Sequence, residues 1–395
     1  MSPGSGNRRE LAIISAAFFF AFLGAGASQP FVVSYLMDGK GLPLGHASLV
    51  LSMVYFAFVV FRFFIGFILD RVGLQWGKIL GVATYALFPM VLVATGSFPL
   101  LLAGSVMWGL GAPMLWTSSL VQVMNASGST RYATSAGIVR GTVMAAVLLG
   151  GIVLSYIYER WGYEALFLSA GASGLVGIGV MAASPRRTVV REKPNLDTFL
   201  RVMRSRETQA VVAFLLCSGL AYGLVLNGFK SHIERECGAA WLKGILPCFS
   251  VAAILSSFLG GRICDRVGRW PVFAWGFAIG AVGMLLAGVS GHPVALMVAM
   301  LLIGVQFAIV PLAGFAWIGD KTTPSDRASV MGYVFCFRDL GVAVAIQLRG
   351  LSRDPATAFL VFGGISAVCG VCAFAVGRAL GNTGRDCPRG CSGRN

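Results

Sequence analysis

Four ionisable side chains lie well inside long apolar stretches of this sequence. They are Arg62, Arg140, Arg338 and Asp339. A charge at the centre of a bilayer-spanning helix costs about 2.5–3.5 kcal/mol on an insertion scale, so each should be paired or functional. Arginine presents a planar fork that fits a carboxylate or a phosphate and stays charged when buried. Three arginines against one aspartate leave an excess of positive charge that an anion would offset.

All four residues fall in one layer of the predicted structure. Counted along a helix from the polar residues at the nearer end of each stretch, they lie about 12 to 18 Å deep. No histidine lies near them, because His46, His232 and His292 all fall in predicted outer loops. Asp339 is therefore the one intramembrane carboxyl that the sequence offers to a coupled proton.

The elements that position this layer are predicted to be membrane-spanning helices. Hydrophobic residues make up 56% of the 395 residues and charged residues 12%, against about 25% charged in soluble domains. A helix needs about 20 apolar residues to cross the hydrocarbon. Twelve stretches qualify, at residues 11–36, 47–69, 78–96, 99–123, 132–157, 164–183, 208–229, 239–261, 271–290, 293–318, 327–348 and 356–379. We predict an all-α membrane protein.

The net charge of +15 is explained by topology. If the N-terminus lies inside, 21 Lys and Arg residues fall on the cytoplasmic side and 7 outside, which is the bias expected of inner loops. We therefore expect both termini inside and an attraction to anionic lipid, with no nucleic acid as partner.

One motif occurs twice, 195 residues apart. Residues Gly66–Gly73 read GFILDRVG and residues Gly261–Gly268 read GRICDRVG, and the same offset maps Gly137 onto Gly332. A duplicated bundle is a usual way to build two halves around a central site.

A polar linker divides the repeats. We predict an N-terminal six-helix bundle at 1–183, a cytoplasmic linker at 184–207, a C-terminal six-helix bundle at 208–380 and a cytoplasmic tail at 381–395. Within the linker, Thr198–Arg206 fits either a basic amphipathic helix on the inner leaflet or a solvated tether.

Twelve spans in two repeats, with Gly-x-x-x-Asp-Arg-x-Gly after spans two and eight, resemble the major facilitator superfamily (MFS). Arg131–Gly137 and Arg327–Gly332 resemble the family's starts of spans five and eleven, and Trp161–Phe167 resembles its start of span six. The second motif continues with Arg269 as in the family, whereas the first has Leu74 there. The resemblance implies a monomeric secondary transporter of the inner or plasma membrane, with two pseudo-symmetric six-helix bundles and alternating access.

The resemblance also implies a cytoplasmic gate at the repeated motif. Small residues let helices approach closely, and a carboxylate at a helix end can pair with a base or face the N-terminus of another helix. The closing glycines allow a tight turn. The alternative is that the motif only ends and turns the helices. The gate candidates are Gly66, Asp70, Arg71, Gly73, Gly261, Asp265, Arg266, Gly268 and Arg269.

In the family fold, span two packs against span eleven, which suggests that Arg62 and Asp339 form an ion pair that bridges the halves and changes during transport. The alternative is that Arg62 extends to the inner surface. Adjacent side chains on a helix diverge by about 100°, so Arg338 would then face the cavity together with Arg140. The alternative for Arg140 is that it binds backbone carbonyls and only positions span five.

Further binding candidates lie on spans that line the cavity in the family. Aromatic residues there are often packing residues instead. The candidates are Gln29, Trp108, Trp116, Tyr222, Asn227 and Gln306.

The predicted function is transport of a small organic anion of the carboxylate type, by proton symport if Asp339 titrates, or by facilitated diffusion or exchange. The alternative is efflux of drugs or other lipophilic or zwitterionic compounds. Against that alternative, Ala146-Val147 replace the Gly-Pro that drug antiporters carry in span five. No set of residues predicts an enzyme, a cofactor or a metal site, and Cys387 and Cys391 in the tail are expected to be free.

Overall fold

The computed structural model describes residues 3–127, 131–184, 202–351 and 355–383, and over these residues it contains helices and no strand. Eleven of the described helices are long and apolar enough to cross a membrane. One of them, α7 (Tyr132–Ala182), has 51 residues and a glycine with φ of 79° at Gly162, where two spans join at a kink. Counting α7 as two spans gives the twelve that the sequence predicts.

The first half of the chain contains six spans. The first span is interrupted by two π-helical segments around Pro30, and the second is broken at Phe64, where φ is −94° and ψ is 5°. Its elements are α1 (Pro3–Ala21), η1 (Phe22–Gly26), α2 (Ala27–Ser34), η2 (Tyr35–Gly39), α3 (Leu44–Phe63), α4 (Ile65–Val72), α5 (Leu74–Ala94), α6 (Phe98–Ser127) and α7. The predicted single helix at 47–69 is therefore two helices.

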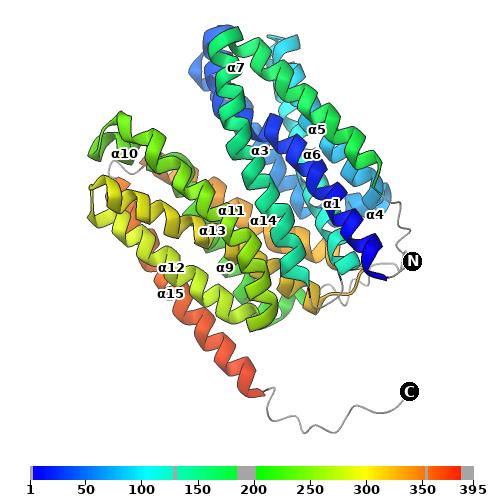
Figure 1. Ribbon diagram of the computed structural model, residues 1–395, viewed down its shortest axis with the longest axis vertical. Coiled ribbons are helices and arrows are strands. Elements are labelled where there is room, and N and C mark those ends of the chain that lie inside the picture. Colours follow the sequence, from blue (N-terminus) through cyan, green and yellow to red (C-terminus); the bar gives the residue numbers. More distant parts are fainter. Residues whose placement is uncertain (1–2, 128–130, 185–201, 352–354, 384–395) are drawn as a thin grey trace.

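The second half repeats this arrangement, and its last two spans extend beyond the predicted ends. Its elements are α9 (Arg206–Leu224), η3 (Val225–Phe229), α10 (Lys230–Glu236), η4 (Ala239–Trp241), α11 (Leu242–Val267), α12 (Arg269–Val289), α13 (Pro293–Lys321), α14 (Arg327–Leu351) and α15 (Pro355–Thr383). Figure 1 shows the first half, blue to blue-green, lying beside the second half, green to red.

The two halves contact each other mainly through α7 with α11 and α3 with α14, and also through α7 with α13 and through α14 with α4 and α6. Glycines allow the close approach. A Cβ atom added to Gly137 would lie 2.3 Å from the Ser257 carbonyl oxygen, and one added to Gly332 would lie 2.7 Å from the Arg62 carbonyl oxygen. These contacts are related by the 195-residue offset at both partners, so the sequence repeat is a repeat of packing.

Several sequence predictions fall wholly or mostly outside the described residues. They concern the linker, where residues 185–201 and so the first four of Thr198–Arg206 are not described, and the tail with Cys387 and Cys391. The limits proposed for the bundles, linker and tail stay a prediction.

Candidate functional site

A charged layer lies between the halves at mid-length of the spans. Arg62 on α3 forms an ion pair with Asp339 on α14, and both side chains are largely buried. The Arg62 guanidinium also lies 5.0 Å from the Phe58 ring centroid and 5.5 Å from that of Phe335. Arg62 therefore points into the interface rather than to the surface, and the predicted contact is present.

The second oxygen of Asp339 contacts its neighbour. Arg338 Nη1 lies 3.4 Å from Asp339 Oδ1. Adjacent positions on a helix predict that these two side chains diverge. Their charged ends nevertheless meet, because the long arginine side chain reaches around to the carboxylate. The Arg338 guanidinium also lies over the rings of Tyr222 and Phe307, at 5.7 and 5.5 Å from their centroids.

Arg140 on α7 approaches the same phenylalanine from the other half. Its Nη2 donates to the Phe307 carbonyl oxygen at 3.4 Å, and its guanidinium lies 5.4 Å from the Phe307 ring centroid. The carbonyl contact that the sequence analysis weighed as an alternative is thus present, as one long hydrogen bond. Arg140 and Arg338 therefore meet around Phe307, and the buried Nε of each has no hydrogen-bond partner among the described residues.

A small cavity adjoins these arginines within the second half. Two of its wall residues, Tyr222 and Phe307, are the ones that lie under the guanidinium groups. The space between its atoms, including the open mouth, is about 180 Å³. The wall residues are Ser218, Ala221, Tyr222, Phe249, Ile303, Gln306 and Phe307, from α9, α11 and α13.

Of the other binding candidates in the second half, the structure describes Gln306. Its Nε2 donates to Ser366 Oγ at 3.4 Å, and its Oε1 lies against Gly280, where an added Cβ atom would meet it at 1.8 Å. Its amide therefore points between helices of the second half. Asn227 lies in η3, and its side chain is outside the described part of the chain.

The candidates of the first half pack within that half. The Trp108 ring lies on those of Tyr85 and Phe88, and the Trp116 ring on that of Phe18. Gln29 Oε1 accepts a hydrogen bond from the Tyr55 hydroxyl at 2.8 Å. None of the three lines the cavity described above, so the binding roles predicted for them have no geometric support.

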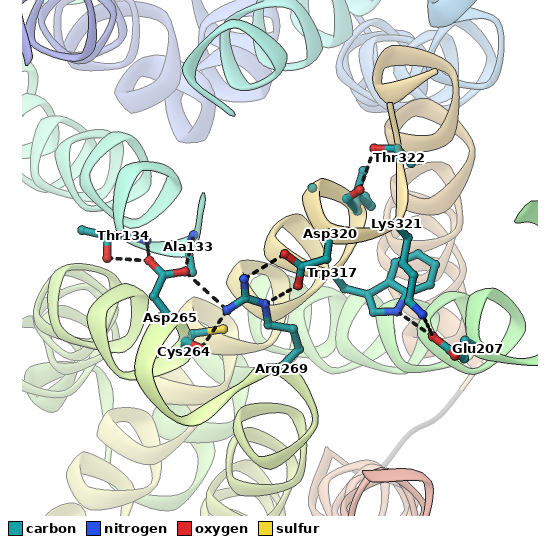
Figure 2. A network of polar contacts seen from close by, with 12 residues as sticks. Ala133, Thr134, Glu207, Cys264, Asp265, Arg269, Trp317, Asp320, Lys321 and Thr322 are labelled. Atoms are coloured by element: carbon teal, nitrogen blue, oxygen red, sulfur yellow. Dashed lines mark hydrogen bonds and ion pairs between the residues drawn. The ribbon is translucent and has the colours of Figure 1, made fainter. Parts of the chain in front are cut away.

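The second copy of the repeated motif binds the first half directly (Figure 2). The Asp265 carboxylate accepts hydrogen bonds from the backbone N–H groups of Ala133 at 3.1 Å and Thr134 at 2.7 Å, and from the Thr134 hydroxyl at 2.7 Å. These groups form the N-terminus of α7, where unpaired N–H groups and the helix dipole favour a negative charge. This is one of the two arrangements that the sequence suggested for an aspartate at this position.

Arg269 extends that contact into the second half (Figure 2). Its guanidinium lies 3.4 Å from Asp265 Oδ1, and its Nε and Nη2 donate to the Asp320 carboxylate at 2.8 and 3.1 Å. Farther along α13, Lys321 pairs with Glu207 at 2.8 Å. The ends of α9, α11, α12 and α13 are thus joined by charged groups.

The glycines of the motif act through the backbone. Gly73 and Gly268 have φ values of 82° and 102°, which favour glycine. A Cβ atom added to Gly66 would lie 2.1 Å from Ser329 Oγ, and one added to Gly261 would lie 2.5 Å from the Ala133 carbonyl oxygen. The Arg71 and Arg266 side chains are exposed, and the gating role of the motif stays a prediction.

Sequence reasoning missed a second clasp between the halves. Arg327, at the start of α14, donates to Asn125 Oδ1 and to the Tyr132 hydroxyl, the latter at 2.8 Å. Tyr132 and Arg327 are themselves related by the 195-residue offset. The repeat therefore related these two positions already in the sequence, but Arg327 was assigned only to the start of a span.

The sequence counts Lys78 as a cytoplasmic charge but does not predict its burial at the start of α5. Lys78 is fully buried, and its Nζ donates to Ser184 Oγ at 2.9 Å. Nearby, buried Glu10 accepts a hydrogen bond from Gln122. These contacts lie within the first half, away from the charged layer.

The fold and the sequence agree with one family. Residues 14–235 and 211–383 match the family model described as Major Facilitator Superfamily. The chain belongs to that superfamily, whose members are transporters, and is a multi-pass membrane protein.

Relatives support the assignment over most of the chain. The chain is 27% identical over 370 residues to the uncharacterized MFS-type transporter YhhS of Escherichia coli K12, covering 88% of this chain and 87% of that one. It is 30% identical over 116 residues to Multidrug resistance protein 2 of Bacillus subtilis, 29% of each chain.

Solved structures share the fold. The E. coli fucose:proton symporter FucP superposes with a TM-score of 0.76 at 16% identity, over 92% of this chain and 97% of that one. The human organic anion transporter MFSD10 gives 0.73 at 15% identity, over 93% and 99%. At these identities the likeness shows the fold alone.

Proposed function

We propose that this transporter moves a small organic anion of the carboxylate type across the cell inner membrane by alternating access. The observation that carries the proposal is the charged layer: at the junction of the halves Arg140 is buried and Arg338 is largely buried, and the Nε of each has no partner among the described residues. The one carboxylate that the structure shows bonded to this layer, Asp339, is shared with Arg62. A buried excess of positive charge favours a ligand that brings negative charge.

The contacts between the halves support alternating access. Asp265 on the N-terminus of α7 and Arg327 on Asn125 both lie at the end of the bundle where α1 begins. With the N-terminus in the cytoplasm, as the positive-inside bias predicts, this conformation is closed to the cytoplasm. A FucP structure in the outward conformation superposes with a TM-score of 0.74.

We further propose that Asp339 couples transport to a proton. Protonation would remove the charge that holds Arg62 and would free the pair that bridges α3 and α14. The similarity to FucP, a proton symporter, agrees with symport.

Efflux of lipophilic or zwitterionic compounds is the second candidate. The match to Multidrug resistance protein 2 over 116 residues favours it. A lipophilic cation would have to enter a layer that already carries excess positive charge, which places this candidate second.

Thermal unfolding of the purified full chain tests the proposal. A ligand at about 100 times its dissociation constant adds about 2.7 kcal/mol to the free energy of unfolding. We expect stabilisation by carboxylates, lost in Arg140→Gln and Arg338→Gln and kept in Arg160→Gln, an exposed arginine of the same helix α7. Stabilisation by lipophilic cations alone would overturn the proposal in favour of efflux.

A further inference from the structure

We propose that the transported anion is an aromatic monocarboxylate, with its carboxylate between Arg140 and Arg338 and its ring against the aromatic wall of the cavity in the second half. This inference rests on the proposed anion transport and specifies the substrate class of that site. The juxtaposition that carries it is Phe307, which contacts both arginines and is also a wall of the cavity.

The position of the carboxylate follows from the guanidinium groups. Both lie within 5.5 Å of the Phe307 ring centroid, one contributed by each half. Each keeps a buried Nε–H without a partner among the described residues. A carboxylate there would accept charge-assisted hydrogen bonds from both halves at once and, unlike a neutral ligand, would also offset their positive charge.

The position of the ring follows from the cavity wall. The rings of Tyr222 and Phe249 lie 4.3 and 5.1 Å from that of Phe307, centroid to centroid. Ala221 and Ile303 complete an apolar surface beside them. Aromatic rings make offset or edge-to-face contacts with such a wall in addition to burying apolar area.

The same wall argues against other anions. A second carboxylate on the ligand would face aromatic rings without a base. An ammonium group would need a carboxylate, and Asp339 already contacts Arg62 and Arg338. A dicarboxylate and an amino acid are therefore both poorer matches than a monoanion.

The Ser218 hydroxyl in the cavity wall predicts a preference among ligands with a substituted ring. Ser218 lies one helical turn from Tyr222, its side chain is buried, and its hydroxyl has no hydrogen-bond partner among the described residues. A hydroxyl group on the ligand ring would give Ser218 that partner. We therefore expect hydroxybenzoate isomers to include a tighter ligand than benzoate, and expect Ser218→Ala to remove the difference.

The test measures dissociation constants of the purified full chain for benzoate, cyclohexanecarboxylate, butyrate and benzylamine. We expect benzoate to bind at least tenfold more tightly than butyrate and more tightly than cyclohexanecarboxylate, and benzylamine not to compete. Phe307→Leu should reduce the preference for benzoate over butyrate at least threefold while butyrate still binds. Phe249→Leu provides a second wall variant should Phe307→Leu fail to fold, and Phe273→Leu, a buried ring outside the cavity, is the matched control.

The outcomes separate the two proposals. If butyrate and cyclohexanecarboxylate bind as tightly as benzoate, the aromatic inference is overturned while anion transport stands. If no carboxylate binds, or if benzylamine alone binds, anion transport itself fails.

Discussion

Two seams join the halves of this transporter, and they differ in where their charges lie. The α7–α11 seam brings Gly137 against Ser257, and the α3–α14 seam brings Gly332 against Arg62. Each pair is the other moved by 195 residues. The backbone packing of the two seams is therefore the same, although the side chains are not.

The charges have diverged at mid-depth. The counterparts of Arg62, Arg338 and Asp339 are Ser257, Val143 and Met144, at the same offset of 195 residues. At this depth the α3–α14 seam thus carries the Arg62–Asp339 ion pair and the Arg338 guanidinium. The three matching positions of the α7–α11 seam are uncharged, and Arg140 is the charged residue that α7 places in this layer.

At the end of the bundle where α1 begins, an ion pair within the second half has no counterpart in the first half. Arg269 and Asp320 pair in the second half, but their counterparts in the first half are Leu74 and Asn125. Asn125 instead accepts a hydrogen bond from Arg327 across the α3–α14 seam. The comparison teaches that the two seams share their close helix contacts, whereas the charged residues proposed for ligand binding and coupling are not repeated at the 195-residue offset.

The largest expected effect comes from breaking the ion pair. Asp339→Asn leaves Arg62 buried without its counter-charge, and losing one partner of a buried pair costs about 3–5 kcal/mol of unfolding free energy. We expect that loss in denaturant unfolding, together with loss of proton-coupled uptake.

The double variant Arg62→Met, Asp339→Leu is the control. Because a well-packed apolar pair often replaces a buried ion pair without cost, it should recover stability and still lack coupling. Full transport and coupling in Asp339→Asn would remove the pair from the mechanism.

Glycine variants test the shared packing of the seams. Gly137→Ala and Gly332→Ala each place a methyl group within 2.3 to 2.7 Å of a carbonyl oxygen on the other half. Overpacking of this kind costs about 1–3 kcal/mol. We expect both to separate the halves at this end, measured as longer distances between spin labels at exposed Trp76 and Arg262.

Gly151→Ala is the matched control, since an added Cβ atom there meets no atom within 4 Å. If the label distances stayed unchanged in both seam variants, the close helix packing at the seams would not be what holds the two halves together at this end.

The Arg327 clasp should have an effect of similar size. Arg327→Gln removes hydrogen bonds to Asn125 and Tyr132, and bonds to a charged group contribute about 1.5–3 kcal/mol. Tyr132→Phe removes only one of them and should cost less. The same spin-label pair should report opening in Arg327→Gln, and an unchanged distance distribution would show that the clasp is dispensable.

The smallest effect is expected for Arg269→Leu, which copies the first half at Leu74. Its closer partner Asp320 is partly exposed. Its second partner Asp265 keeps the hydrogen bonds from the N-terminus of α7, so the loss of Arg269 should cost at most about 1 kcal/mol in thermal unfolding. A loss above about 2 kcal/mol of unfolding free energy would show that the charged network of the second half stabilises the protein more than the uncharged residues at the matching positions of the first half.

The sequence predicted the fold well because spans, repeats and loop motifs are local patterns. It also predicted the contact between Arg62 and Asp339, since family packing places those spans together. It did not predict that Arg338 reaches the same carboxylate, because side-chain length outweighs the divergence of adjacent helix positions. Trp108 and Trp116 pack on rings of their own half, because a span that lines a cavity also turns aromatic residues into its own bundle, and their binding role stays a prediction. The cavity at Phe307 depends on three helices meeting, which no local pattern shows.

Calorimetric titration of a carboxylate into the purified protein tests the central claim most directly. Benzoate should bind to the wild-type chain and to Arg160→Gln with the same affinity, and at least tenfold more weakly to Arg140→Gln and to Arg338→Gln. Equal affinity in all four proteins would contradict the claim that the arginines of the charged layer hold the anion.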